Sequence, residues 1–276
     1  MSVTAKQVQD LRKMSGAGMM DCKAALAENN ADLDLAFQWL REKGIAKAQK
    51  KSTREANEGL VSIMSNTSGT AVVEINSETD FVSRNKDFHA LVKKITQIVL
   101  DAEDNAESVK DEISSIINDA IGVIGENIVF KRSSFIKGKT YNYIHNSLGD
   151  NLGKIGVLLD IKSDPEIDLT SLGKNICMHI AATGPKSLNE SSLDPDVIET
   201  EKNIIKEQLK ESGKPDDIVE KMLSGKMNKF FEEVVLLNQK YVIDPSVTIT
   251  KLLEDTGNAN SSKISINSFI RYELGQ

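Results

Sequence analysis

The sequence has little of the residue types that build disulfide frameworks, metal centres and membrane spans. It contains two cysteines and three histidines in 276 residues, and no apolar run approaches the ~20 residues that a membrane-spanning helix needs. Cys22 and Cys177 lie far apart and neither belongs to a C-x-x-C pair, so neither a disulfide framework nor a structural zinc site is favoured. We therefore expect a protein without metal ions or cofactors, whose two thiols are buried or inert.

The net charge and the first residues narrow the class of ligand. A formal net charge of −7 at pH 7 disfavours nucleic acid as the main ligand, because neutralising phosphates needs a basic surface. The opening residues, MSVTAKQVQD, contain neither the apolar stretch of a secretory signal nor an Arg-rich transit segment. The sequence thus predicts a cytoplasmic protein that binds another protein, with no direct contact to nucleic acid or membrane.

The N-terminal segment predicts three short helices. Thr4 and Gln7 have the spacing of a capping box at the start of the first helix. Asp32 can cap the third helix, which we expect to end at Gly44. The small, polar and basic stretch at 44–57 indicates a solvated linker or an extension of this helix, with a docking contact as the alternative.

Two later segments of the chain share one plan, in which two strands are followed by a helix and a closing strand. Alternating and helical periods of apolar residues indicate this plan at 59–77, 88–100 and 127–136, and again at 141–161, 171–182 and 263–274. The plan occurs only twice, which is too few for a repeat array. We therefore expect an α+β fold with a duplicated core.

A segment rich in Glu and Lys interrupts the second copy of this plan. Apolar residues recur every three or four positions on both sides of a break at 212–217 that contains Gly and Pro. This pattern predicts an antiparallel helical hairpin with its tip at 212–215. The predicted divisions are a helical module with its linker at 1–54, a first core subdomain at 55–140, and a second at 141–276 with the hairpin inserted at about 196–237.

No recognisable catalytic motif occurs in the sequence. The stretch Gly16-Ala17-Gly18 lacks the preceding strand and the G-K-[ST] of a phosphate loop. His179 follows Cys177 by two residues on a predicted helix, so their side chains point to different faces and a shared metal site is not expected. Neither G-x-S-x-G nor H-E-x-x-H is present. We predict that the protein is not an enzyme, and that His179 is either packed inside or facing a partner.

The segment ETDFVSRN at 78–85 stands out instead. It connects a predicted strand to a predicted helix, and such connections usually lie at the surface. Phe81, flanked by Asp80 and Arg84, is therefore a candidate anchor for another protein. In the alternative, Ser77 and Asp80 form a capping box and Phe81 packs inward. The spacing of the residues leaves the direction of Phe81 open.

Two segments, EINSETDFVSRN at 74–85 and LRKMSGAGMMDCKAAL at 11–26, resemble the signature segments of bacterial elongation factor Ts. Further similar segments are IGENI at 124–128, KIGVLL at 154–159, CMHIAATGP at 177–185 and GKPDDIVEKMLSGKMNKF at 213–230. The similarity runs in order along almost the entire chain. It implies a guanine nucleotide exchange factor for elongation factor Tu, the GTPase that carries aminoacyl-tRNA to the ribosome.

The resemblance also implies which residues act. In this family the aromatic residue of T-D-F-V enters between helices of the partner's G domain, beside the adjacent Asp, and disturbs the magnesium site and the phosphate loop until GDP leaves. A first module similar to a ubiquitin-associated fold packs on the same domain. The implied partner-binding residues are Thr79, Asp80, Phe81 and Val82 in the motif, Arg12, Met19, Met20 and Lys23 in the module, and Ile124, Gly125 and His179. The complex would be a heterodimer or a dimer of heterodimers.

Two other functions stay open beside this one. The helical module could belong to an adaptor of the ubiquitin-associated type that has no exchange activity, because a fold alone does not fix a function. An enzyme with an unrecognised site is the third interpretation.

Overall fold

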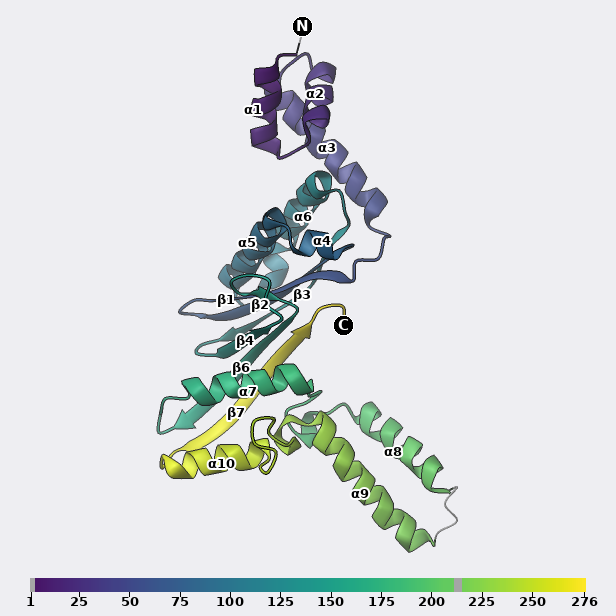
Figure 1. Cartoon of the computed structure of the whole chain (residues 1–276), viewed down its shortest axis with the longest axis vertical. Coiled ribbons are helices and arrows are strands. Elements are labelled where there is room, and N and C mark those ends of the chain that lie inside the picture. Colours follow the sequence, from purple (N-terminus) through teal and green to yellow (C-terminus); the bar gives the residue numbers. More distant parts are fainter. Residues whose placement is uncertain (1–2, 211–214) are drawn as a thin grey trace. The chain divides into compact units, whose positions relative to one another are not determined.

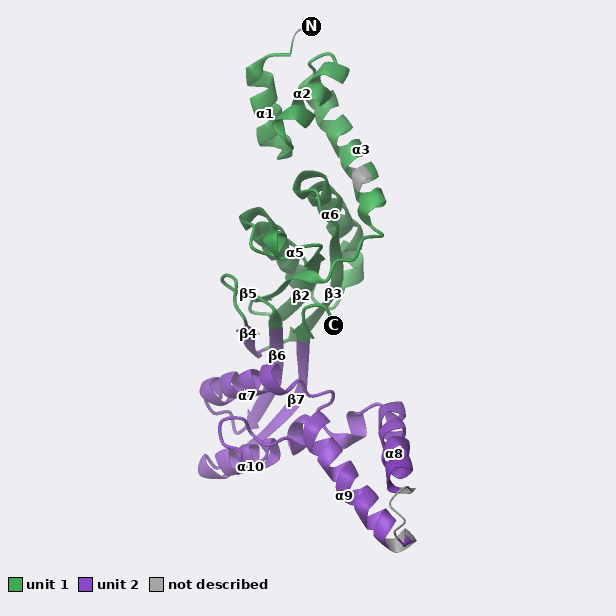
Figure 2. Cartoon of the chain, turned by 45° about the vertical axis from the view of Figure 1, so that its right-hand side comes forward, with its two compact units in different colours: residues 1–138, 146–155, 272–276 green, residues 139–145, 156–271 purple. Residues whose placement is uncertain are grey.

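The computed structural model describes residues 3–210 and 215–276. The chain folds into two compact units, which Figure 2 shows in different colours. Unit 1 holds the residues up to 138 together with 146–155 and 272–276, and unit 2 holds 139–145 and 156–271. None of the described helices combines the length and the apolar character needed to span a membrane. The mixture of helices and sheets agrees with the predicted α+β class, whereas the three-part division of the chain stays a prediction.

Unit 1 begins with a helical module of three helices, α1 (Ala5–Ser15), α2 (Met19–Glu28) and α3 (Leu33–Lys51). The predicted capping box is present, because Gln7 N–H donates to Thr4 Oγ1 at 3.3 Å and Thr4 N–H donates to Gln7 Oε1 at 3.0 Å. Asp32 Oδ1 caps α3 by accepting two backbone N–H groups, each at 2.9 Å. The three helices bury a small core around Leu11, Cys22 and Leu26.

Helix α3 continues past Gly44, where we expected it to end. Gly44 lies instead at a crossing with α6 (Lys110–Ile124), where a Cβ atom on Gly122 would lie 3.1 Å from the Cα atom of Gly44. Arg41 pairs with Asp119 beside this crossing, at 3.4 Å. The prediction was wrong because it weighed the local stop signal of a glycine alone. The contacts that extend the helix come from an element far along the chain, and the stretch we predicted as linker or helix extension is mostly helix.

The first sheet belongs to unit 1 and has the strand order β3-β2-β1-β5. Its strands, all antiparallel to their neighbours, are β1 (Glu58–Ser65), β2 (Gly69–Ser77), β3 (Ile128–Lys137) and β5 (Leu152–Gly153). The hairpin of β1 and β2 and the closing strand β3 confirm the predicted plan. Helix α5 (Lys86–Ala102) and helix α6 lie along this sheet (Figure 1).

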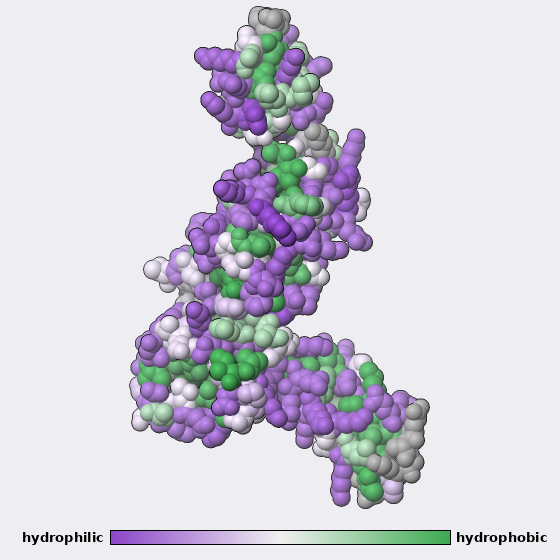
Figure 3. Space-filling view, viewed as in Figure 1, coloured by the Kyte–Doolittle hydropathy of each residue, from purple (hydrophilic) through white to green (hydrophobic). Residues whose placement is uncertain are grey.

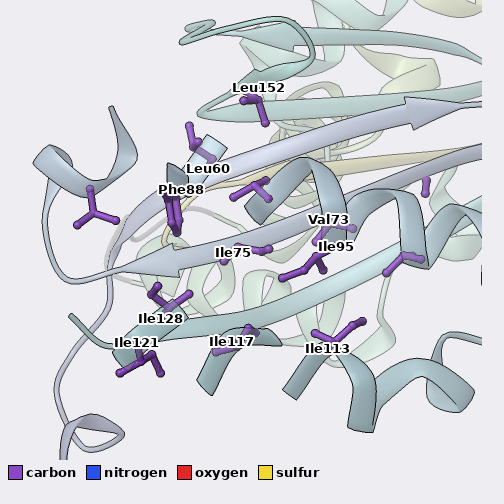
Figure 4. Close-up of a cluster of buried hydrophobic side chains, with 14 of the residues drawn as sticks. Leu60, Val73, Ile75, Phe88, Ile95, Ile113, Ile117, Ile121, Ile128 and Leu152 are labelled. Atoms are coloured by element: carbon purple, nitrogen blue, oxygen red, sulfur yellow. The ribbon is translucent and has the colours of Figure 1, made fainter. Parts of the chain in front are cut away.

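The core of unit 1 lies between this sheet and its two helices, as Figure 4 shows. Leu60 and Ile75 of the sheet are fully buried, as is Phe88 in the first turn of α5. Helix α6, which we did not predict, contributes Ile113 and Ile117 at a spacing of four residues. Each large apolar side chain buried in this way stabilises the fold by about 1.5–3 kcal/mol. The core thus fixes the ends of the strands and helices from which the connecting loops leave.

A buried ion pair connects residues 272–276 to the first sheet. The Glu74 side chain is fully buried, and its carboxylate accepts from Arg132 Nε at 2.6 Å and from Gly275 N–H at 3.1 Å. The Arg132 guanidinium also lies over the Tyr272 ring, 4.3 Å from its centroid. A buried carboxylate is tolerated because its charge is paired and its oxygens accept hydrogen bonds.

Unit 2 contains the second sheet, with the strand order β4-β6-β7. Its elements are β4 (Tyr141–His145), β6 (Ile155–Asp164), α7 (Thr170–Thr183), α10 (Ile249–Ala259) and β7 (Lys263–Glu273). The predicted strands, helix and closing strand are confirmed, and α10 was not predicted. A simple hairpin turn does not connect β4 to β6, because the segment between them contains β5, which pairs with β1 in the first sheet. The duplicated origin of the two cores and the ubiquitin-associated likeness of the module stay predictions.

The predicted helical hairpin is present in unit 2 as α8 (Pro195–Lys210) and α9 (Asp216–Val234). Ile205, Leu209 and Met227 form its buried seam. Figure 3 shows other apolar side chains on the surface of this hairpin, among hydrophilic ones. The predicted tip falls largely outside the described residues.

Candidate functional site

The segment 78–85 connects β2 to α5, as predicted, and contains the single-turn helix α4 (Asp80–Ser83). Phe81 projects from this turn with 81% of its surface exposed. The alternative with an inward Phe81 is wrong. Ser77 Oγ donates to the Thr79 carbonyl at 3.1 Å instead of capping the helix, and Thr79 is the N-cap residue. An aromatic ring exposed to this extent contributes little to the core and is free to be buried by another molecule.

The side chains of Asp80 and Val82, on either side of Phe81 in the sequence, point in different directions. Asp80 lies half-buried and pairs with Arg84 Nη2 at 3.0 Å. A pair this exposed contributes about 0–1 kcal/mol, so the carboxylate can change partners at little cost. Val82 packs into the core of unit 1. The resemblance implies Val82 as a partner-binding residue. One helical turn points successive side chains to different sides, however, and the Val82 side chain anchors the loop from within.

Two carboxylates tie this segment to the loop that follows α6. Glu126 accepts from Thr79 Oγ1–H at 2.7 Å with one oxygen and from Thr79 N–H at 3.0 Å with the other. In the opposite direction, Glu78 Oε1 accepts from Asn127 N–H at 2.6 Å. The Thr79 hydroxyl is therefore engaged with Glu126 and forms no cap bond to α4. No sequence pattern distinguishes these two from the other acidic residues, of which the chain has 41 in total.

The same loop carries Ile124 and Gly125, two further residues that the resemblance implied. Gly125 ends α6 in the left-handed conformation, with φ of 87°, and its N–H donates to the Ile121 carbonyl at 3.0 Å. Lys51, at the end of α3, donates to the Gly125 carbonyl. Ile124 is half-buried against the core, whereas Gly125 is exposed. The structure thus brings residues 124–126 and the segment 78–81 together.

The four predicted residues of the helical module are all exposed. Arg12 lies on α1, and Met19, Met20 and Lys23 lie on the first turns of α2. The two methionines expose 57% and 76% of their surfaces. Flexible thioether side chains of this kind suit adaptable contacts with a partner.

His179 is fully buried in unit 2, so of the two interpretations left open the packed one holds. Its Nε2–H donates to Gln239 Oε1 at 2.9 Å, and its Nδ1 accepts from Val242 N–H at 3.3 Å. Gln239 in turn donates to the Glu233 carbonyl at 2.7 Å, which fixes the orientation of its amide group. Burial lowers the pKa of His179, with the bond to Gln239 acting in the opposite direction. A direct contact between this side chain and a partner does not fit its burial on the inner face of α7.

The residues beside His179 are exposed and apolar. Val242 and Ile243, which follow the buried Tyr241, present 43% and 57% of their surfaces to solvent. The His179 ring lies 6.0 Å from the Tyr241 ring and holds the Val242 backbone. The sequence did not single out this pair, although two adjacent apolar residues before Asp244 and Pro245 suggest an exposed turn.

The described residues offer no cluster of three or more His, Cys, Asp and Glu side chains that could hold a metal ion. Burial raises the pKa of the Cys177 thiol to about 12, so this cysteine stays protonated and is a poor nucleophile. The geometry at 78–81 and 124–127 is that of a presented side chain on a braced loop, which suits binding.

Comparisons with known proteins agree with this interpretation. The sequence profile of the family described as Elongation factor TS matches residues 78–276. Curated proteins named Elongation factor Ts are similar to the whole chain. The protein from Bartonella tribocorum is 47% identical over 288 residues, covering 100% of this chain and 94% of the relative. Those from Paracoccus denitrificans and Rhizobium meliloti are 45% and 43% identical, over 283 and 288 residues, covering 100% of this chain and 93% and 94% of the relatives.

Proposed function

The chain belongs to the elongation factor Ts family, and on that premise we propose that it promotes release of GDP from elongation factor Tu by inserting Phe81, with Asp80 beside it, into the G domain of that GTPase. Membership of the family places the chain in translation elongation, and we propose that it works in the cytoplasm. The observation that carries the proposal is the outward direction of Phe81 on a loop fixed to the core.

Exchange of this kind needs binding energy and no chemical step. A factor that binds the nucleotide-free GTPase more tightly than the GDP-bound form must weaken GDP binding by the same ratio, because the two equilibria are linked. GDP is held through Mg²⁺ and the amides of the phosphate loop. Displacing the helices around that site removes compensation for the phosphate charge. A rigid aromatic wedge is therefore sufficient, and no acid or base is required.

The surroundings of Phe81 suit a wedge. Val82 holds the turn to the core from inside, while Thr79 is held by two hydrogen bonds to Glu126. Phe81 can therefore press against a partner without folding back into its own chain. A few central anchor residues dominate many interfaces, and truncating such an anchor to alanine costs about 2 kcal/mol or more of binding free energy.

Further contacts spread the interface beyond the wedge. We propose that Arg12, Met19, Met20 and Lys23 bind the same G domain, and that Ile124 and Gly125 lie against it beside Phe81. His179 would act through the residues it holds, with Val242 and Ile243 as the apolar surface that unit 2 offers to another domain of the partner. One copy of each protein, or a pair of such complexes, would form the assembly.

An adaptor of the ubiquitin-associated type is not favoured. Such an adaptor would need only the helical module, whereas the family match covers residues 78–276, which lie outside it. An unrecognised enzyme likewise has no support from the arrangement of the described titratable residues.

Stopped-flow release of a fluorescent GDP from the cognate GTPase tests the proposal. We expect the wild-type chain to accelerate release strongly, and the double variant Asp80→Ala with Phe81→Ala to lose most of that acceleration while remaining folded. Leu35→Ala is the matched control, because Leu35 is an exposed apolar residue outside the proposed interface. No acceleration by the wild type would refute the exchange function, and full acceleration by the double variant would refute the assignment of the wedge.

A further inference from the structure

The two loops of the candidate site hold each other through a reciprocal pair of carboxylates, which we call the loop clamp (Glu78, Thr79, Glu126 and Asn127). Glu126 binds the backbone and the hydroxyl of Thr79, and Glu78 binds the backbone of Asn127. The clamp thus consists of three hydrogen bonds with donor–acceptor distances of 2.6–3.0 Å. Hydrogen bonds to ionised carboxylates are stronger than those between neutral groups.

The clamp supplies a hydrogen-bond acceptor to a backbone N–H group in each of the two loops. Helix α4 spans four residues, too few to be stable as an isolated helix, and no side chain caps its start. Thr79 N–H finds its acceptor in Glu126, and Asn127, which is 2% exposed, finds the acceptor for its N–H in Glu78. Unpaired half-buried N–H groups are costly, so losing a carboxylate would favour rearrangement of the loop.

The second loop is itself braced from two sides. Asn127 Nδ2 donates to the Arg54 carbonyl at 2.7 Å, and Lys51 donates to the carbonyl of Gly125. Residues 51–54 follow directly from the long helix α3, which begins in the helical module. Contacts therefore run from the end of α3 to the loop after α6, and from that loop through Glu126 to the residue two positions before Phe81.

We propose that Glu126 is a positioning residue for nucleotide exchange, which holds Thr79 so that Phe81 is presented in the geometry that displaces the partner's helices. This inference rests on the proposed exchange function and adds a residue that need not touch the partner. A wedge that is held in place transmits force to the partner, whereas a loose one rearranges itself instead. Loss of the clamp should therefore slow the GDP-releasing step more than it weakens association.

Glu126→Gln is the principal test. A glutamine has no negative charge and only one acceptor oxygen for the two Thr79 donors, so in either orientation of its amide the clamp is weakened with almost no change in side-chain volume. In stopped-flow titrations we expect the saturating rate of GDP release to fall about tenfold, the effect of losing one charge-assisted hydrogen bond. The concentration of factor that gives half the saturating rate should change less than twofold. A loss of folded protein or a weaker interface would instead raise this concentration.

A pair of variants at Thr79 provides the rescue test. Thr79→Ser keeps the hydroxyl that donates to Glu126 and should release GDP at nearly the wild-type saturating rate. Thr79→Val has the shape of threonine without that donor, and its saturating rate should fall several-fold. Glu107→Gln is the control, because Glu107 is an exposed carboxylate of unit 1 that pairs with Lys110 away from the clamp.

Hydrogen exchange at the Thr79 amide in the free protein gives an independent readout, since this amide donates to Glu126. It should exchange faster in Glu126→Gln and at the wild-type rate in Glu107→Gln. If the wild type accelerates GDP release and Glu126→Gln does so with the same saturating rate, the positioning role is refuted and the exchange function stands. Equal saturating rates for Thr79→Ser and Thr79→Val would also refute it. If the wild type itself fails to accelerate release, the proposed function fails first.

Discussion

Phe81 and His179 lie in two segments that both resemble the family's sequence, yet they differ in their exposure to solvent. Phe81 is 81% exposed on a braced loop of unit 1, and His179 is fully buried in unit 2. The Phe81 ring points outward into solvent, whereas both ring nitrogens of His179 are hydrogen-bonded within the chain. A shared signature thus does not indicate whether a residue is exposed at the surface or buried in the fold.

The difference has a thermodynamic side. An exposed side chain can be removed with little effect on the free energy of unfolding, so its loss is visible only when a partner is present. A buried side chain with two hydrogen bonds is part of the fold, and its loss is visible in the isolated protein. Substitutions at the two positions should therefore separate stability from exchange.

The largest effect on stability is expected for His179→Ala. The change leaves a cavity in unit 2 and removes the acceptor of Val242 N–H, which together should lower the free energy of unfolding by about 3 kcal/mol. Urea denaturation followed by circular dichroism measures this. His145→Ala is the matched control, because His145 is exposed in the same unit, and its change should be below ~0.5 kcal/mol. Equal losses of unfolding free energy in the two variants would contradict the prediction that the buried histidine stabilises the fold more than the exposed one.

Phe81→Ala should show the opposite pattern. We expect the acceleration of GDP release to fall at least roughly 30-fold, corresponding to about 2 kcal/mol for the loss of an aromatic anchor. The urea midpoint should stay within the error of the wild type, because the ring contributes nothing to the core. A large drop in the stability of this variant would show that Phe81 packs inside the isolated chain.

The protonation of His179 should make unit 2 sensitive to pH. The neutral ring accepts from Val242 N–H through Nδ1, so a second proton there would oppose another donor. The folded pKa is lowered by burial from 6.5, and the unfolded chain therefore binds more protons below that pH. Stability is complete above pH 6.5 and falls below it, by up to about 1.4 kcal/mol per pH unit until the folded pKa is reached.

This pH dependence can be isolated with the non-titrating variant His179→Gln. Urea midpoints of wild type and variant should converge as the pH falls from 7 towards 5, as carboxylates shared by both proteins cancel in the difference. Burial raises the pKa of the neighbouring Tyr241, so that group stays uncharged throughout. A constant difference between the two proteins over this range would contradict the assignment to His179.

The smallest effect is expected for Arg84→Ala, which removes the exposed ion pair with Asp80. The free energy of unfolding should change by less than ~0.5 kcal/mol, because solvent screens both groups. Thermal unfolding of the variant beside Lys251→Ala, which breaks a similar exposed pair with Asp255, measures this. A loss well above that of the control would mean that the Asp80 side chain is held in place by Arg84.

Sequence reasoning was most successful where the signal was local and repeated. Alternating apolar residues in 59–77 predicted β1 and β2, and the helical period at 88–100 predicted α5. Helix α6 was not predicted, although Ile113, Ile117 and Ile121 recur every four residues. The end of α3 was misplaced because the close approach of Gly44 and Gly122 joins residues that no short window contains.

The candidate site was less accessible to sequence reasoning. The motif identified Phe81, but its spacing fitted both an outward and an inward ring, since one helical turn offers both directions. The family resemblance supplied an outward direction, which the exposure of Phe81 confirms. His179 is paired with Gln239, 60 positions away, and Glu126 is paired with Thr79, 47 positions away. Pairings over such separations produce no pattern in a short window of the sequence.

The buried carboxylate of Glu74 has a consequence for the order in which the protein is built. Its bond to Gly275 N–H spans 201 residues, and Tyr272 lies against its partner Arg132. Domains generally fold from the N-terminus as synthesis proceeds, and long-range closure slows folding. Here the unit that presents Phe81 is completed only after all of unit 2 has been synthesised. A chain interrupted in translation before residue 272 would therefore lack the bond between Glu74 and Gly275 and the contact of Tyr272 with Arg132, so we expect unit 1 to reach its final packing only after residue 275 has been added.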